Sequence, residues 1–331
     1  MTVVLRAAMD QGLVALQRQL RTLAPDIALI TDGEHALERT TPDTRPPRLV
    51  RAELAEGHAL QARPVPGDPV AAFAAFLDGT QTSRVVAYVD GTPIVHGTVA
   101  AVVRSRRNRR LTTWRQPIVQ RRLYVCLRAL KPERRRLLEA LGIRLVDTTP
   151  TSEDPAAHPY ILQNDAVHRV QEDREEAERK LAEQWCTNER DPLFIDGSIS
   201  GSDKIAVSAC TVGVVKSHRT LYAEGDALQT IFSLRRGERS SVFRVTSPKR
   251  VPVASWYLRL RDSLGHDPMW GLVRVEIAYP TRNDLDAIGA RADEVSLWTL
   301  AEVSPLALPD ARWDKMVYGI HDCEEFLHAV T

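Results

Sequence analysis

The chain has 331 residues, of which 44% are hydrophobic and 26% charged, and this fits one large globular domain or two smaller ones. Its formal net charge of +1 excludes a polycation, so any attraction to nucleic acid must come from local patches. The four cysteines are far apart and form no CxxC pair, which argues against a zinc site and favours a reducing, cytoplasmic location. No apolar run approaches the ~18 residues of a membrane span, and the start lacks the layout of a signal peptide, so we expect no membrane partner.

The first 70 residues are predicted to be a helical extension of the main domain at 71–331. Apolar residues recur at three- and four-residue spacing over 1–24, and Pro25 ends this helix. The leucines that mark its apolar face include Leu13, Leu16 and Leu20. A second helical piece is expected at 49–61, and a short helix after Pro-Gly-Asp-Pro at 66–69. We expect this part to pack on the main domain or on a partner.

An apolar run then ends in Phe76-Leu77-Asp78-Gly79-Thr80, and the branched residues of 84–89 follow it. Asp90-Gly91-Thr92-Pro93 predicts a hairpin turn into a strand at 94–103. A carboxylate at the end of a buried strand is seldom there for packing, because buried carboxylates are almost always paired or bind a metal. A single Asp-Gly is nevertheless most often a plain turn, so Asp78 needs a second signal.

The stretch 104–136 is strongly basic and is predicted to be an insert. Glu133 is its only acid, and Trp114 and Tyr124 are interleaved with the basic residues. A solvated loop and helix face is one interpretation, but such faces usually mix both signs. Arginines with aromatics suit phosphate contacts and base stacking on single strands. The residues that we expect to contact nucleic acid are Arg104, Arg106, Arg107, Arg109, Arg110 and Arg115.

A long helix is predicted at 164–188. Its apolar stripe consists of Val167, Val170, Ala177, Leu181 and Trp185. At about 100° per residue, Asp173 and Glu178 fall on the two borders of this stripe, where each acid can face the sheet beneath. Glu172, Glu175, Glu176 and Glu183 point to solvent on the same helical projection. An acidic helix that is simply solvated and paired with basic neighbours is the competing interpretation.

A second Asp-Gly motif, which supports the interpretation of Asp78, follows this helix. Leu193-Phe194-Ile195 leads into Asp196-Gly197-Ser198, and the apolar run 211–215 delivers Lys216-Ser217. Gly197 allows a sharp turn and a close approach to a ligand. Two strands that end in Asp-Gly-Ser/Thr predict a pair of carboxylates converging at one end of a sheet. Such oxygen ligands suit Mg²⁺ or Mn²⁺.

The remaining chain alternates strands and helices. We expect helices at 227–234, 284–302 and 323–330, and strands at 241–245, 254–260 and 271–277. The order predicts an α/β fold: an RNase H-like mixed β-sheet core flanked by helices, with the N-terminal helical extension. Two strand-end aspartates and a helix glutamate are the constellation of an RNase H-like metal-dependent nuclease. Two metals about 4 Å apart stabilise the attacking and leaving oxygens of a phosphodiester, and several carboxylates must neutralise them.

At these residues the chain resembles the NurA nuclease family. The resemblance covers about 75–330 and is carried by Leu77-Asp78-Gly79-Thr80, the Asp196-Gly197-Ser198 strand end, 212–217 and Val273-Arg274-Val275-Glu276. It implies an RNase H-like core and a Mn²⁺-dependent DNA nuclease that resects ends in DNA repair or antiphage defence. It also implies a toroidal homodimer that works beneath the hexameric helicase-translocase HerA.

The family's motif also assigns roles to residues. Asp78 and Asp196 would be the strand carboxylates, Glu178 the helix glutamate and Lys216 the lysine of Val-Lys-Ser. The family ends with a Tyr followed by a His. Tyr318 and His321 are the candidates here, at a shorter spacing than in the family, and His328 is the alternative. Thr80 stands where the family has Ser.

Three classes of protein compete on this sequence. The first is a nuclease, and the second is a non-catalytic DNA-binding or scaffold subunit of the same fold. The third is another phosphoryl-transfer enzyme, such as an actin-like ATPase, whose fold also uses Asp-Gly turns. The absence of a GxxxxGK[ST] motif argues against a P-loop ATPase. Mn²⁺-dependent loss of labelled DNA without nucleotide separates the three.

Overall fold

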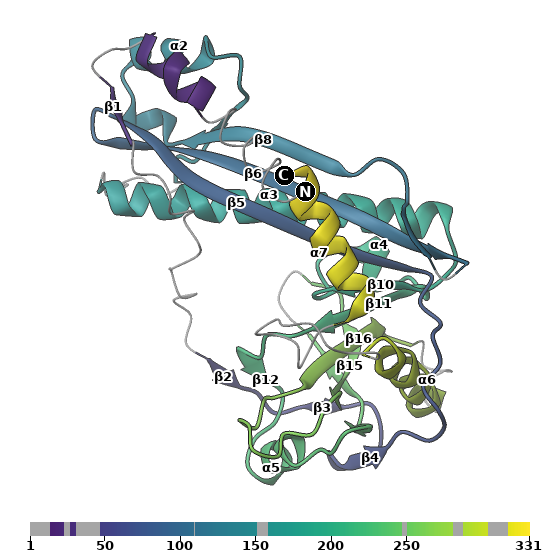
Figure 1. Ribbon diagram of the computed structural model, residues 1–331. Helices are drawn as coiled ribbons and strands as arrows, with labels where there is room; N and C mark the ends of the chain where they lie inside the picture. The colour runs from purple at the N-terminus through teal and green to yellow at the C-terminus, as the bar shows by residue number, and fades with distance from the viewer. Residues whose placement is uncertain are drawn as a thin grey trace.

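One mixed β-sheet connects the two halves of the molecule (Figure 1). The structure is a computed structural model that describes residues 14–22, 27–30, 47–108, 110–150, 158–246, 250–280, 287–303 and 317–331. Within these residues the sheet has 14 strands, in the principal order β3-β14-β15-β16-β11-β10-β5-β6-β8-β9. The predicted α/β class, a mixed sheet flanked by helices, is confirmed.

The longest strands form an antiparallel meander. They are β5 (Ala75–Val89), β6 (Thr92–Arg107) and β8 (Ile118–Val125), and β9 (Leu145–Asp147) pairs with β8 in parallel. The sequence predicted that this strand ends at Asp78-Gly79, but β5 continues beyond that point. Its residues pair with β6 from Ala75 to Val89, with one irregularity at 85–87, so the backbone ladder carries the strand through the Asp-Gly step. Asp78 therefore lies inside a strand.

The basic stretch 104–136 is largely part of this framework. It supplies the end of β6, the short β7 (Arg110–Thr113), β8, the 3₁₀ turn η1 (Leu127–Ala129) and helix α2 (Pro132–Glu139). β7 pairs with the end of β6, with Arg107 opposite Arg110. Much of the charge that suggested a separate insert is thus carried on a hairpin that continues the sheet.

Helix α3 (Pro159–Asn188) returns the chain to the sheet, where two parallel strands follow. β10 (Leu193–Asp196) pairs in parallel with β5, and β11 (Thr211–Val215) pairs in parallel with β10. The short helix α4 (Asp203–Ala206) lies between them in the chain. The central order is therefore β8-β6-β5-β10-β11. Asp196, unlike Asp78, does end its strand.

The second half of the sheet is antiparallel. It contains β13 (Glu238–Ser240), β14 (Phe243–Val245), β15 (Val253–Arg259) and β16 (Leu272–Ala278), which pairs with β11. Helix α5 (Asp226–Phe232) precedes these strands. A pair of two-residue strands, β12 (Thr220–Leu221) and β2 (Arg48–Leu49), forms a separate small sheet.

The N-terminal extension is only partly helical. Residues 14–22 form a helix whose Leu16 and Leu20 are buried in the chain's own core, and β1 (Ala28–Leu29) pairs with β5. The helix predicted at 49–61 is wrong: β3 (Glu53–Leu54) pairs with β14, and β4 (Ala62–Pro64) pairs with β13. No helix follows at 70–74 either, since these described residues lead directly into β5. Edge pairing to a sheet formed far along the chain overrides local helical spacing.

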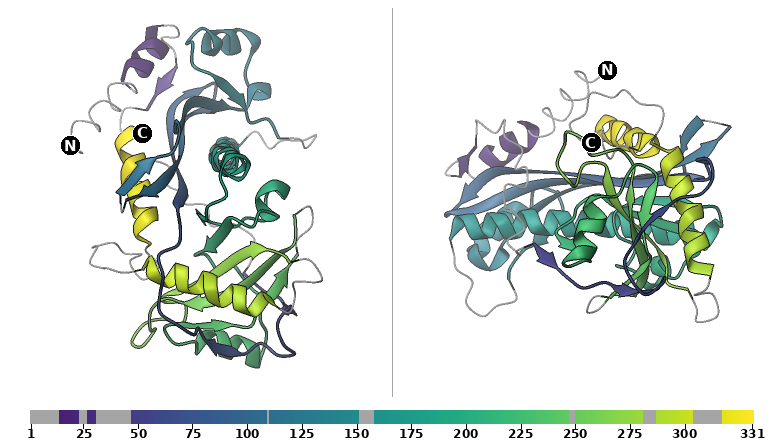
Figure 2. Two further views of the ribbon diagram at one scale, coloured as in Figure 1. Left: turned by 90° about the vertical axis from the view of Figure 1, so that its right-hand side faces the viewer. Right: turned by 90° about the horizontal axis from the view of Figure 1, so that it is seen from below.

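Two helices cover opposite faces of β5 and β6. α3 lies on one face and α7 (Tyr318–Val330) on the other, as the left view of Figure 2 shows. Strand alternation divides β5 between them. Leu77 packs in the cluster that contains Val170 and Leu181 of α3, whereas Phe76 packs in the cluster of Ile320 and Leu327 of α7.

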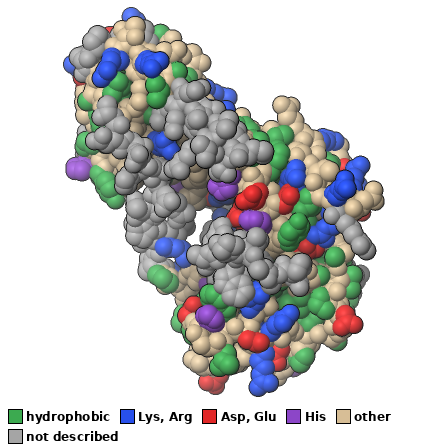
Figure 3. All heavy atoms as spheres, in the orientation of Figure 1, with side chains coloured by type: hydrophobic (Ala, Val, Ile, Leu, Met, Phe, Trp, Pro, Cys, Tyr) green, Lys and Arg blue, Asp and Glu red, His purple; other side chains and the backbone are tan. Residues whose placement is uncertain are grey.

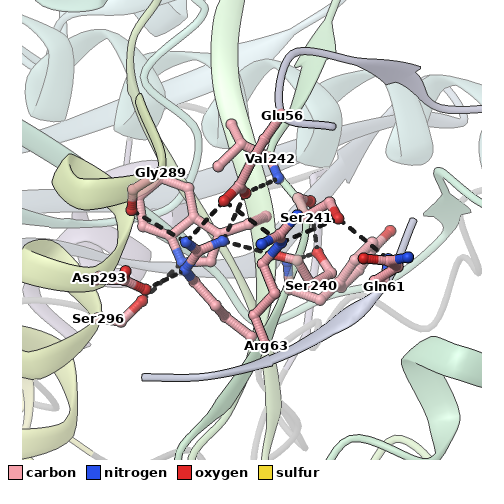
Figure 4. Close-up of polar contacts among 12 residues, drawn as sticks. Glu56, Gln61, Arg63, Ser240, Ser241, Val242, Gly289, Asp293 and Ser296 are labelled. Carbon is pink, nitrogen blue, oxygen red and sulfur yellow. Dashed lines mark hydrogen bonds and ion pairs between the residues drawn. The ribbon is translucent and has the colours of Figure 1, made fainter. Parts of the chain in front are cut away.

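A buried arginine ties the N-terminal segment to the second half. Arg239 is 2% exposed and donates to the Glu56 carboxylate, to Asp293 of α6 (Ile288–Ala301) and to the carbonyl of Gly289 (Figure 4). Glu56 also accepts from the backbone N–H of Val242. These contacts satisfy the guanidinium in a place that water does not reach. They account for the close fit of the 53–64 segment to the sheet.

Candidate active site

Asp78 and Asp196 lie on adjacent strands at the same level of the sheet. β10 and β5 are parallel, and Ile195 is paired with Leu77. The next residue of each strand is an aspartate, so the two carboxylates are neighbours on the same face of the sheet. The repulsion between their charges is large enough to contribute to the raised pKa of Asp78. The predicted convergence of the two Asp-Gly motifs is present in this register.

The turn after Asp196 is held by a buried glutamate. Glu276 of β16 is 1% exposed, and its Oε2 accepts from the Ser198 hydroxyl at 2.8 Å and from the Ile199 N–H at 3.0 Å. Gly197 has a φ of 141°, in a region that favours glycine. Beneath the turn, a side chain at Gly213 would meet the Gly197 carbonyl oxygen at 2.7 Å. The close packing of this turn on β11 thus fixes where the end of β10 points.

Asp78 is buried on the face of β5 that α7 covers. Phe76, two residues earlier on the same face, accepts a hydrogen bond from the Cys323 thiol through its carbonyl oxygen. Burial, followed by the charges of Asp196 and Glu178, raises the pKa of Asp78 to about 8. Its Oδ1 accepts from the Gly79 N–H at 2.8 Å, which acts in the opposite direction. Burial and the nearby Asp78 charge also raise the pKa of the Cys323 thiol.

Glu178 reaches the sheet from the other side. It extends from α3 onto Gly79, where an added Cβ would clash with the Glu178 side chain, so a larger residue at position 79 would displace Glu178. Burial raises the pKa of Glu178 to about 7, although Arg174 opposes this shift. Arg174, one turn earlier on the helix, donates from Nη1 to Glu178 Oε1. Its Nε donates to the Gln81 side chain at 3.2 Å.

The predicted helix phase agrees with the observed burial. The Glu178 side chain is 16% exposed, whereas that of Glu176 is 39% exposed and is paired with Arg179. Asp173, the other border residue, is also buried, but its carboxylate accepts from Arg122 at 2.5 Å and from the Tyr124 hydroxyl at 2.8 Å. Asp173 therefore anchors α3 to β8, and Glu178 is the helix acid near the two aspartates.

A cavity of about 500 Å³ opens beside these groups. Its wall includes the acids Glu176, Glu178 and Asp196, the 196–199 turn, and the basic residues Arg174, Arg179 and Arg250. Asp78 is buried and does not belong to the wall. Glu178 and Asp196 thus share this hollow, and Asp78 lies beside Asp196 on the neighbouring strand without lining it.

The donor set suits a hard divalent cation, which prefers carboxylate oxygens. Burial is the main cause of the raised pKa values of Asp78 and Glu178, and the charge of Asp196 raises both further. Among the described residues, however, no three His, Cys, Asp or Glu side chains form a group ready to hold a metal. Glu178 is directed to Arg174, and Lys216 Nζ lies 2.8 Å from Asp196 Oδ2. Metal binding at this place requires exchange of those two ion pairs.

The C-terminal candidates lie apart from the acids. Tyr318 begins α7 and is exposed, and His328 is exposed near its other end. His321 is half-buried, and its Nδ1 lies 4.0 Å from Glu324 Oε2. Within the described residues, no hydrogen bond or ion pair joins Tyr318 or His321 to the three carboxylates. Cys323 is the α7 side chain that the structure links to Asp78.

The six arginines proposed for nucleic acid divide into two groups. Arg104 is paired with Asp322 of α7 at 2.5 Å and stacks over Phe326, and Arg106 is paired with buried Glu302 at 2.5 Å. Arg107, Arg110 and Arg115 are exposed, and Arg109 lies outside the described residues. On the face seen in Figure 3, basic and acidic side chains are interspersed. Arg104 and Arg106 thus fasten α7 and the end of α6 to β6.

Two functional contacts were not predicted from the sequence. Glu276 holds the Asp196 turn, and Arg174 holds Glu178. The position of Arg174 was accessible in principle, because an Arg four residues before a Glu predicts an ion pair on one helix face. The motif Val273-Arg274-Val275-Glu276 had singled out Glu276, but it did not indicate the contact with the turn, since its partners lie 77 and 78 residues away in the chain.

Comparison with known proteins adds no family assignment. No protein-family model matches the chain, and a search of curated proteins finds no significant relative. Within the part of the chain that the structure describes, no helix combines the length and apolar character needed to span a membrane.

Proposed function

We propose that this protein is a metal-dependent DNA nuclease that hydrolyses phosphodiester bonds at the Asp196–Glu178 cavity. The observation that carries the proposal is the convergence of Asp78, Asp196 and Glu178 from three elements, with the pKa of Asp78 raised to about 8 and that of Glu178 to about 7. Perturbed carboxylates beside a cavity are candidates for a functional site. The meander, crossing helix and parallel strand pair in the order β8-β6-β5-β10-β11 support the RNase H-like core that the NurA resemblance implies.

Bound Mn²⁺ or Mg²⁺ would supply Lewis acidity at the scissile phosphate and activate water as the nucleophile. Asp196 and Glu178 would hold the metal from the cavity wall, with Asp78 adding negative charge from the neighbouring strand. Lys216 keeps the Asp196 carboxylate in place until then. Glu276 keeps the 196–199 turn in the conformation that presents Asp196 to the cavity.

The resemblance extends this proposal to partners and context. A homodimer acting beneath a HerA-type hexameric ATPase, in DNA repair or antiphage defence in the cytoplasm, is the setting that it implies. The exposed Arg107, Arg110 and Arg115 would then contribute phosphate contacts to the DNA path.

A second function, a non-catalytic DNA-binding or scaffold subunit of such a complex, is favoured by one observation. The two cavity acids are each neutralised by a basic side chain, Arg174 on Glu178 and Lys216 on Asp196. A permanent ion pair would leave neither acid available to a metal.

Digestion of labelled single- and double-stranded DNA by the purified protein, without nucleotide, separates these functions. We expect fragments with Mn²⁺, and none with EDTA or with Asp196→Asn. Binding without cleavage under every metal tested would support the scaffold and contradict the nuclease. Release of phosphate from ATP without DNA cleavage would favour an ATPase.

A further inference from the structure

Arg174 is a basic side chain held in place at the cavity. It lines the cavity wall, and its guanidinium bridges Glu178 on its own helix and Gln81 on β5. Its side chain is 24% exposed, against 41% for Arg179. These two contacts, one on α3 and one on β5, fix the direction of the guanidinium. A fully exposed arginine has no such fixed direction.

We propose that Arg174 binds a non-bridging oxygen of the scissile phosphodiester when a metal is present. This inference rests on the proposed nuclease function. In the structure the Nη1 group of Arg174 donates to the Glu178 carboxylate. A divalent cation at Glu178 and Asp196 competes for the same carboxylate and repels the guanidinium. Gln81 still holds Nε, so the freed Nη1 remains directed at the cavity.

A phosphate oxygen is the acceptor that this geometry fits. The guanidinium is planar, always charged and able to donate two parallel hydrogen bonds to a phosphate. A cation beside the metal also compensates the negative charge that develops on the phosphate oxygens during hydrolysis. The same residue therefore shields Glu178 without metal and contacts substrate with it.

Arg179 provides a matched control on the same helix. It also lines the cavity, but its partners are Glu176 and Glu183, which lie outside the three-carboxylate site. A metal bound at Glu178 and Asp196 does not compete for Glu176 or Glu183, so Arg179 should keep both ion pairs. Substitution of Arg179 thus removes one positive charge from the same wall without removing the proposed phosphate contact.

The first experiment measures affinity for a short single-stranded DNA in EDTA and in Ca²⁺, with intact DNA verified after each titration. We expect Arg174→Ala to bind like wild type in EDTA, because Glu178 compensates the charge of Arg174 there, and about tenfold more weakly in Ca²⁺. Arg174→Lys should recover part of the loss, since lysine keeps the positive charge but cannot donate two parallel hydrogen bonds to one phosphate. Arg179→Ala should differ little from wild type in both conditions.

The second experiment measures Mn²⁺ affinity without DNA by calorimetry. Arg174→Ala should bind Mn²⁺ at least as tightly as wild type, because a competing positive charge is gone, while its Mn²⁺-dependent cleavage falls about tenfold or more. Arg174→Gln, checked with the others by thermal melting, serves if the alanine variant does not fold. A merely structural role for Arg174 would instead lower Mn²⁺ affinity and cleavage together.

Several outcomes would overturn the inference. These are equal losses of DNA affinity with and without Ca²⁺, no loss in either condition, weakened Mn²⁺ binding, and a loss in Arg179→Ala equal to that in Arg174→Ala. If the wild-type protein binds Mn²⁺ and cleaves DNA while Arg174→Ala matches it, only the inference fails. If the wild-type protein neither binds Mn²⁺ nor cleaves DNA, the proposed function fails and the inference with it.

Discussion

Lys216 and Asp196 form an ion pair at the end of two parallel strands, with Nζ 2.8 Å from Oδ2. Both side chains are about one-fifth exposed, at 21% and 19%, and Asp196 also lines the cavity. A partially exposed pair of this kind can exchange for a metal ligand at low cost. The hydrogen bonds of Glu276 to the 196–199 turn fix the position of Asp196 independently of its ion pair with Lys216.

Asp196→Asn should abolish cleavage and leave the fold and DNA binding largely intact, because it keeps the shape of the side chain but removes a ligand charge. Asp78→Asn should act in the same way. The double variant should cost little more than either single one, since residues that act as a unit are not additive. Cleavage rates with Mn²⁺, together with circular dichroism, test this. Wild-type cleavage by Asp196→Asn would show that no nuclease site is present here.

The two faces of α3 should respond differently to loss of charge. Glu178→Gln should lose more than the roughly 10–100-fold typical of a residue that only supports a metal ligand. Glu176 also lines the cavity but is more exposed, and Glu176→Gln should lose little, because its carboxylate is already paired with Arg179 and Lys180. Initial cleavage rates of the two variants test this difference. An inactive Glu176 variant beside an active Glu178 variant would mean that the wrong face of the helix has been assigned.

The raised pKa of Asp78 should make the metal-free protein less stable as the pH rises. Its folded pKa is about 8, whereas an unfolded aspartate titrates near ~3.9, so between these values the folded state binds a proton that the unfolded state has released. Stability from this group is complete below pH ~4 and is lost as the pH rises toward 8. Asp78→Asn removes the dependence, so its Tm should exceed that of wild type by several degrees at pH 8.

Thermal melts in EDTA at pH 4, 6 and 8 measure this difference. The gap between Asp78→Asn and wild type should close toward pH 4, and Mn²⁺ should stabilise wild type more at pH 8 than at pH 6, because metal and protons compete for the same oxygens. Parallel pH profiles for the two proteins in EDTA would contradict the raised pKa.

The basic residues should separate by role. Replacing Arg107, Arg110 and Arg115 with Ala should weaken DNA binding and flatten its salt dependence without loss of stability, because all three are exposed. Arg106→Ala should instead destabilise the protein by about 1–3 kcal/mol, since it leaves buried Glu302 without its partner. Filter binding at two salt concentrations and urea denaturation measure the two effects. An unchanged salt slope in the triple variant would remove these residues from the DNA path.

The protein should be a dimer in solution, as the NurA resemblance implies. Leu16 and Leu20 do not supply an interface, because the chain's own core buries them. Light scattering at micromolar concentration should give twice the chain mass of 37.0 kDa. A mass of one chain under those conditions would contradict the prediction.

The sequence by itself determined the elements whose patterns are strongly periodic or purely apolar. The α3 stripe, the inward position of Glu178, the strands at 193–196 and 211–215 and the α/β class follow from side-chain spacing, because burial on one face imposes a period on the chain. The prediction that Asp78 and Asp196 approach each other needed only two strands in parallel register.

Tertiary structure decided what depends on partners distant in sequence. β5 continues through Asp78 because β6 pairs with it, and 53–64 joins the sheet because β13 and β14 provide an edge. Arg104 and Arg106 serve structure because Asp322 and Glu302 lie beside them, about two hundred residues later in the chain. The local sequence shows where a charged side chain is, but it does not show which residue pairs with it. Only the folded chain selects the partner, because the energy of an ion pair depends on distance and burial rather than on sequence.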